Sequence, residues 1–158
     1  MVPLLLLLAF ATRSTTSFPP KPPATRVVTA CLAVTRSDVQ FALGRAVGPG
    51  QEESSGNEST CDYATDRGQV SVTVQQLQQE VDIKAETAAL LREIEGSSAR
   101  PAPNLGAQAF FLDIPGAGTQ LHVIRGRDYL LVSILGFGEA WQMSGAAESL
   151  ARTALRRM

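Results

Sequence analysis

The chain has 158 residues, of which 14 are Lys or Arg and 15 are Asp or Glu. This balance of charge, with no basic run interleaved with aromatic residues, argues against a nucleic-acid-binding protein. Hydrophobic residues make up 44% of the chain and charged residues only 18%, which is typical of a globular protein with one core.

The amino-terminal residues 1–17 are predicted to be a signal peptide. The apolar run over residues 4–11 has the length of a signal-peptide core, and Ala9-Phe10-Ala11 matches the small-x-small pattern of cleavage sites. No Lys or Arg precedes the run, so the positive region is the amino terminus alone unless the true start lies upstream. Because the run is too short to span a bilayer, we expect no mature transmembrane segment and a location outside the cytoplasm, either secreted or in the periplasm or cell envelope.

Residues 18–28 are predicted to form a disordered linker. The stretch Pro19-Pro20-Lys21-Pro22-Pro23 favours an extended, solvated chain because proline fixes φ and lacks an amide donor. Residues 29–158 are then expected to form a single domain.

Cys31 and Cys61 are the only cysteines, and an even number in an exported chain favours one disulfide between them. Two alternatives are weaker. Val28-Thr29-Ala30-Cys31 fits the consensus before a lipoprotein cysteine, but the apolar core that lipidation requires ends near Ala11. A zinc site would need more ligands than two thiols and His122 supply, so no metal is expected.

The first expected element is a helix over residues 35–44, in which Thr35 and Asp38 form a capping box and Gly44 ends the helix. Residues 48–59 are polar and rich in Gly and Ser, so we expect a mobile loop there. Residues 60–65 and 69–77 flank the turn Asp66-Arg67-Gly68 with alternating valines, which predicts a half-buried hairpin.

A second helix is expected over residues 83–94, with Gly96 as a left-handed stop, followed by a proline-rich connector. Residues 107–114, 119–125 and 129–135 read as an antiparallel meander. The last of these strands is apolar on both sides, so it lies centrally or contacts a partner. A final helix is expected from about Ser144.

Together these elements predict an α+β fold with the order α-β-β-(β)-α-β-β-β-α. We expect one antiparallel sheet of five to six strands with the helices on one face. The order is close to an αβββ unit used twice, although the two halves show no convincing repeat of residues.

Four short motifs resemble an uncharacterised class of bacterial exported proteins and lipoproteins. The segment 31–39 has a Cys, aliphatic residues, Thr, an acid and Val; the others are Leu43-Gly44, Cys61-Asp62-Tyr63 and Leu105-Gly106-Ala107-Gln108-Ala109-Phe110. The resemblance implies an extracytoplasmic location and a cysteine bridge, and it brings no activity or catalytic residue. Unlike the lipoprotein members, this chain lacks a cysteine at the end of its apolar run.

No catalytic constellation is visible in the sequence, and no cofactor is expected. The single histidine, His122, is placed mid-strand, where we expect it to be a partly exposed strand residue. The glutamates lie in the expected loop and on the expected solvated helix, so they form no rigid carboxylate pair.

The segment from Gly136 to Trp141 holds the chain's only tryptophan and Phe137 in a glycine-bearing connection. The simpler interpretation is that both rings cap the core; if exposed, they would anchor a ligand or partner. We therefore expect a monomeric, non-catalytic exported module that binds an unknown protein or small ligand through this connection or through the uncovered face of the sheet. Two alternatives are a secreted inhibitor of another extracellular protein, and a small hydrolase that uses His122 with Ser133 or an acid.

Overall fold

A computed structural model describes residues 28–105 and 108–158. The predicted signal peptide and nearly all of the predicted linker lie outside these ranges. The described chain contains helices α1 (Ala30–Ala33), α2 (Arg36–Leu43), α3 (Ile83–Glu93) and α4 (Ala140–Arg157). Its strands are β1 (Gln51–Ser55), β2 (Glu58–Ala64), β3 (Gln69–Gln76), β4 (Ser98–Pro101), β5 (Gln108–Ile114), β6 (Gly118–Arg125) and β7 (Asp128–Leu135).

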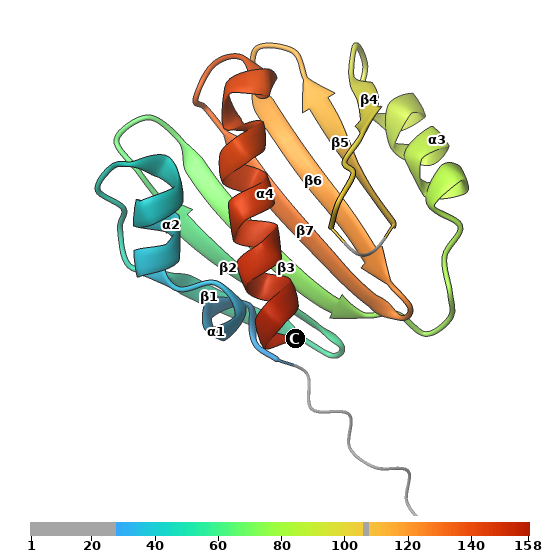
Figure 1. The fold of residues 1–158 in the computed structure, drawn as a ribbon, viewed down its shortest axis with the longest axis horizontal. Coiled ribbons are helices and arrows are strands. Elements are labelled where there is room, and N and C mark those ends of the chain that lie inside the picture. The colour runs from blue at the N-terminus through green and yellow to red at the C-terminus, as the bar shows by residue number, and fades with distance from the viewer. Residues whose placement is uncertain (1–27, 106–107) are drawn as a thin grey trace, which may run out of the picture.

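The strands form one antiparallel sheet of seven strands in the order β1-β2-β3-β7-β6-β5-β4 (Figure 1). Each half is a meander that runs from an edge of the sheet to its centre, and the halves join where β3 pairs with β7 over the full length of both strands. The predicted α+β class is confirmed, and so is the central position of β7. The predicted αβββ repeat has a counterpart in this topology, although the second half has four strands.

Two strands were not predicted from the sequence. The segment expected to be a mobile loop contains β1 and the start of β2, which are joined by a two-residue turn at Gly56 and Asn57. Gly56 has φ +59°, a conformation that glycine adopts at no steric cost. The proline-rich connector contains β4, which pairs with β5 and ends at Pro101. Both new strands lie at the edges of the sheet, so the strand count of five to six was too low.

The helices α1, α2 and α4 cover one face of the sheet, with α4 lying across β5, β6 and β7 (Figure 1). The main core is formed between this face and the helices by the buried residues Val70, Val72, Phe111, Leu121, Val123, Leu130, Val132, Ile134, Ala147, Leu150, Ala151 and Ala154. The first turn of α4 buries no side chain. Its apolar pattern therefore starts late, which is why the sequence placed the helix start at about Ser144 instead of Ala140.

The fourth helix, α3, lies over the opposite face near one edge, which differs from the expectation that all helices share one face. Phe110 points away from the main core, because its neighbours Ala109 and Phe111 pack into that core. Phe110 instead lines a hollow together with Thr87 and Leu91 of α3. The second face is thus covered at β4–β6 and left open over β2 and β3.

The predicted capping box begins α2 as expected. The Thr35 amide donates to Asp38 at 2.8 Å, and the Asp38 amide donates to the Thr35 hydroxyl at 3.4 Å. Arg157, at the end of α4, donates to the same Asp38 carboxylate at 2.6 Å. Partial burial would raise the pKa of Asp38, but the hydrogen bonds from Arg157 and Thr35 outweigh it and hold this pKa at about 2.

The predicted bridge between Cys31 and Cys61 is confirmed: the two residues form a disulfide, with their Cα atoms 5.1 Å apart. The bond joins α1 to β2 beside two further contacts between the same elements. The Ala30 amide donates to Ser59 at 2.9 Å, and the buried Tyr63 hydroxyl donates to the Val34 carbonyl that follows α1. A helix of only four residues is therefore held on the sheet by one covalent and two polar links.

Candidate functional site

The connection between β7 and α4 is held against the β2–β3 turn by close backbone packing. Gly136 has φ +88°, and a Cβ atom at this position would lie 2.7 Å from the Arg67 carbonyl oxygen. A Cβ atom on Gly68 would lie 2.0 Å from the Leu135 carbonyl oxygen. Only glycine fits at either position, so the two segments form one rigid end of the molecule.

The two predicted binding residues of this connection behave differently. Phe137 is 8% exposed and belongs to the core, as expected. Trp141 is 69% exposed in the first turn of α4, so the expectation that both rings cap the core is wrong for Trp141. An indole left this far in water gains nothing for the fold, and exposed aromatic side chains of this kind are common anchors in protein interfaces.

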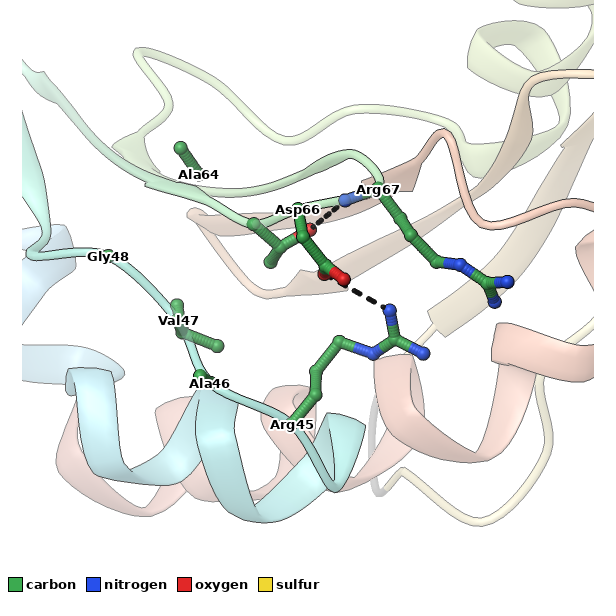
Figure 2. Close-up of a pocket in the computed structure, with 8 residues that line it drawn as sticks. Arg45, Ala46, Val47, Gly48, Ala64, Asp66 and Arg67 are labelled. Atoms are coloured by element: carbon green, nitrogen blue, oxygen red, sulfur yellow. Dashed lines mark hydrogen bonds and ion pairs between the residues drawn. The ribbon is translucent and has the colours of Figure 1, made fainter.

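An open hollow of about 880 Å³ lies at the same end of the molecule (Figure 2). It is formed by the connection between α2 and β1 and by the end of β2 with the turn that follows. Its lining residues are Arg45, Ala46, Val47, Gly48, Ala64, Thr65, Asp66 and Arg67.

Arg45 links the hollow to the β7–α4 connection. Its guanidinium lies over the Phe137 ring at 5.3 Å from the centroid and forms an ion pair with Asp66 at 3.3 Å. In Figure 2 the side chains of Arg45 and Arg67 extend in the same direction. The hollow therefore places two guanidinium groups and one carboxylate next to the segment that carries Trp141.

Hydrogen bonds fix the walls of this hollow. The Gly48 amide donates to the Ala64 carbonyl at 2.8 Å, and Arg36 Nε donates to the Val47 carbonyl at 2.7 Å. The Thr65 hydroxyl accepts from the Gly68 amide at 3.0 Å and from the Arg67 amide at 3.2 Å. Both arginines consequently project from backbone that is already ordered.

His122 is buried, which corrects the prediction of a partly exposed strand histidine. It is 2% exposed and stacks on Phe110 with the ring planes 3° apart. Its Nδ1 lies 2.7 Å from the Tyr129 hydroxyl and its Nε2 lies 3.4 Å from the side-chain amide oxygen of Gln120. The sequence pattern underestimated its burial because the large side chains of Phe110 and Tyr129, on the two neighbouring strands, cover it on a face expected to be open.

Burial sets the protonation state of this histidine. It lowers the pKa of His122 from 6.5 to about 4, and burial likewise raises the pKa of Tyr129 above its ordinary value. His122 is therefore neutral at neutral pH and shares its hydrogen bonds with a phenol and an amide. It lies on the opposite face of the sheet from Phe137, so the structure does not bring the three predicted binding residues together.

The second face of the sheet over β2 and β3 is polar and half-buried. Thr60, Asp62, Ser71 and Thr73 alternate with the core residues of these strands. Thr60 and Thr73 are paired across the strands with their hydroxyl oxygens 2.8 Å apart. These two threonines satisfy each other's hydroxyl groups, and the four side chains named here include no aromatic anchor, so this surface is a weaker candidate contact than the end with Trp141.

Arg45 and Arg67 were not singled out from the sequence. Isolated arginines carry no pattern of their own, and their common location depends on the register of β2 with β3 and on the path from α2 to β1. The turn Asp66-Arg67-Gly68 was recognised only as a turn.

Across the part of the chain that the structure describes, no cluster of His, Cys, Asp and Glu side chains is arranged to hold a metal ion. None of the helices described combines the length and the apolar character that a membrane crossing requires. Comparisons with family models, with curated proteins and with solved structures return no match. The fold and the site thus define a disulfide-bridged α+β protein with a seven-stranded antiparallel sheet.

Proposed function

We propose that this chain is an exported, non-catalytic module that binds another extracellular protein through the end of the molecule around Trp141. The observation that carries the proposal is the 69% exposure of Trp141 next to a rigid backbone and an open hollow. Tryptophan and arginine are the residues most enriched among the dominant contacts of protein interfaces. Trp141, Arg45 and Arg67 provide both kinds at one end of the fold.

A location outside the cytoplasm is part of the same proposal. Disulfides form and persist in oxidising environments, and the link between Cys31 and Cys61 is consistent with a protein that works outside the cytoplasm. The apolar run at residues 4–11 supports export independently. A secreted inhibitor would use the same contact surface, and the identity of the partner would distinguish an inhibitor from an accessory protein.

A hydrolase that uses His122 has weaker support. A general base must reach the proton it removes, and this imidazole is 2% exposed between Phe110 and Tyr129. Its pKa of about 4 also makes it a poor base near neutral pH.

The test is an affinity capture from extracellular or envelope extract of the source cells with three immobilised proteins: wild type, Trp141→Ala and Leu32→Ala. Leu32 is a matched control because it is 67% exposed and lies on α1, where Arg157 of the far end of α4 contacts the Ala33 carbonyl. We expect wild type and Leu32→Ala to retain the same partner and Trp141→Ala to lose it. Capture of identical partners by all three proteins would contradict the proposal.

A further inference from the structure

Arg45 and Arg67 give the open hollow an excess of positive charge. Arg45 is paired with Asp66, whose side chain is 78% exposed. Among the described residues, no carboxylate lies within ion-pair distance of Arg67. Ion pairs exposed to solvent contribute little stability, so a ligand can exchange for Asp66 at small cost.

The backbone that carries Arg67 and the ring that packs against Arg45 are both held in place before a ligand binds. The Arg67 amide is held by Thr65, and the next residue, Gly68, packs directly on the Leu135 carbonyl. The Arg45 guanidinium rests on the Phe137 ring, which leaves the N–H groups at its edge available for hydrogen bonds. Such preorganisation reduces the entropy lost on binding.

We infer that this hollow binds carboxylate side chains of the protein partner, so that the contact segment of the partner is acidic. The inference rests on the proposed function. The planar donors of a guanidinium match the two oxygens of a carboxylate, and charge-assisted hydrogen bonds of this kind are roughly twice as strong as neutral ones. Trp141, four positions after Phe137 in the chain and exposed, would supply an apolar contact to the same partner.

The fluorescence of Trp141, the only tryptophan in the chain, gives a direct measurement. Titration with a tetraglutamate peptide at low ionic strength should produce a saturable change in emission. Tetraglutamine should produce none at the same concentrations, because it keeps the length of the peptide and removes its charge. Absence of a saturable change with tetraglutamate would overturn the inference.

Two charge-neutralising variants locate the site. Arg67→Gln should weaken tetraglutamate binding by about tenfold, or about 1.4 kcal/mol, because the variant loses a charge-assisted hydrogen bond to the carboxylate. Arg92→Gln removes the same charge from the exposed side of α3 and should bind as wild type does. Equal affinities of Arg67→Gln and Arg92→Gln would reject the hollow as the binding site.

Inorganic phosphate distinguishes a carboxylate site from a general anion site. Phosphate should compete with tetraglutamate only at much higher concentration, and competition at equal concentration would overturn the carboxylate assignment. The capture experiment with Trp141→Ala reports separately on the proposed function. If Trp141→Ala loses the partner while tetraglutamate fails to bind wild type, the binding module stands and the acidic contact is rejected.

Discussion

At the scale of single residues, the burial of His122 makes the free energy of unfolding depend on pH. Its pKa of about 4 lies below the 6.5 of an unperturbed histidine because burial disfavours the charged imidazole. Between these two values the unfolded chain binds a proton that the native protein does not bind. The free energy of unfolding must therefore fall as the pH falls from about 6.5 to about 4, and it is unaffected by this group above that range.

We predict a loss of up to about 3 kcal/mol over this pH interval in wild type. His122→Gln should remove that part of the dependence, whatever its stability at neutral pH. The measurement is urea denaturation at a series of pH values, and the quantity that matters is the difference between the two proteins. Parallel curves for wild type and His122→Gln would show that the histidine is not buried in neutral form.

Replacing Gly136 or Gly145 by alanine is expected to change the stability of the protein in opposite directions. Gly136 has a positive φ, and a Cβ atom there would lie 2.7 Å from a backbone oxygen that cannot move away easily. Gly136→Ala should destabilise the protein by about 2 kcal/mol or more. Gly145 lies within α4, where a Cβ atom meets nothing within 4 Å, so Gly145→Ala should stabilise the helix by about 1 kcal/mol.

Thermal denaturation of both glycine variants tests this pair of predictions. A wild-type melting temperature for Gly136→Ala would mean that the β7–α4 connection is looser than described. The claim that Trp141 lies next to a rigid backbone would then be contradicted.

At the scale of elements, α1 depends on its disulfide. A helix of four residues cannot form alone in water, and this one exposes Leu32 while burying only Ala30 and Ala33. The bond to Cys61 closes a loop with a sequence separation of 30. Such a loop reduces the entropy of the unfolded chain by an amount worth about 3 to 4 kcal/mol.

The double variant Cys31→Ser with Cys61→Ser should therefore unfold at a markedly lower denaturant concentration, with a loss of about 3 to 4 kcal/mol. Reduction of wild type with a thiol should reproduce the effect, and the double variant should not respond to the thiol. An unchanged midpoint for the double variant would show that the hydrogen bonds of Ser59 and Tyr63 hold α1 without the covalent link.

At the scale of the whole molecule, the elements with a strong hydrophobic period were predictable and the elements without one were not. The alternation of Val70, Val72 and Val74 identified β3, and the helical spacing from Ala147 identified the main part of α4. All five residues of β1 are exposed, so that strand offers no alternation to detect. Its only signal is the Gly56-Asn57 turn, which also occurs in loops.

Only the aromatic residues of the candidate site could be predicted from the sequence, for the same reason. Composition drew attention to Phe137 and Trp141, but the opposite exposures of the two rings depend on how α4 docks. Arg45 and Arg67 are brought to one hollow by the path from α2 to β1, which is held on the end of β2 by the Gly48–Ala64 hydrogen bond, together with the pairing of β2 with β3. Features that depend on tertiary register cannot be found in local sequence patterns.

The paired strands β3 and β7, where the two halves of the sheet meet, should be the most stable part of the fold. Their pairs, such as Gln69 with Leu135, join residues far apart in the chain, while each half of the sheet is a local meander. Both strands have neighbours on each side, and Val72 and Val132 are fully buried. We expect the amides of β3 and β7 to exchange with deuterium most slowly and those of β1 most quickly, and uniform protection across the sheet would contradict this expectation.

The two outer strands also affect how the protein behaves at high concentration. A sheet with free edges can recruit strands from other molecules, and such growth leads to aggregates. Here β1 carries Glu52 and Glu53 along its exposed length, so two copies aligned at this edge would repel one another. At the other edge β4 has only four residues and ends at Pro101, which lacks an amide donor and lines a hollow with α3, so this edge offers little to a further strand. The same features that hid these strands from sequence patterns thus oppose the addition of a further strand at each edge.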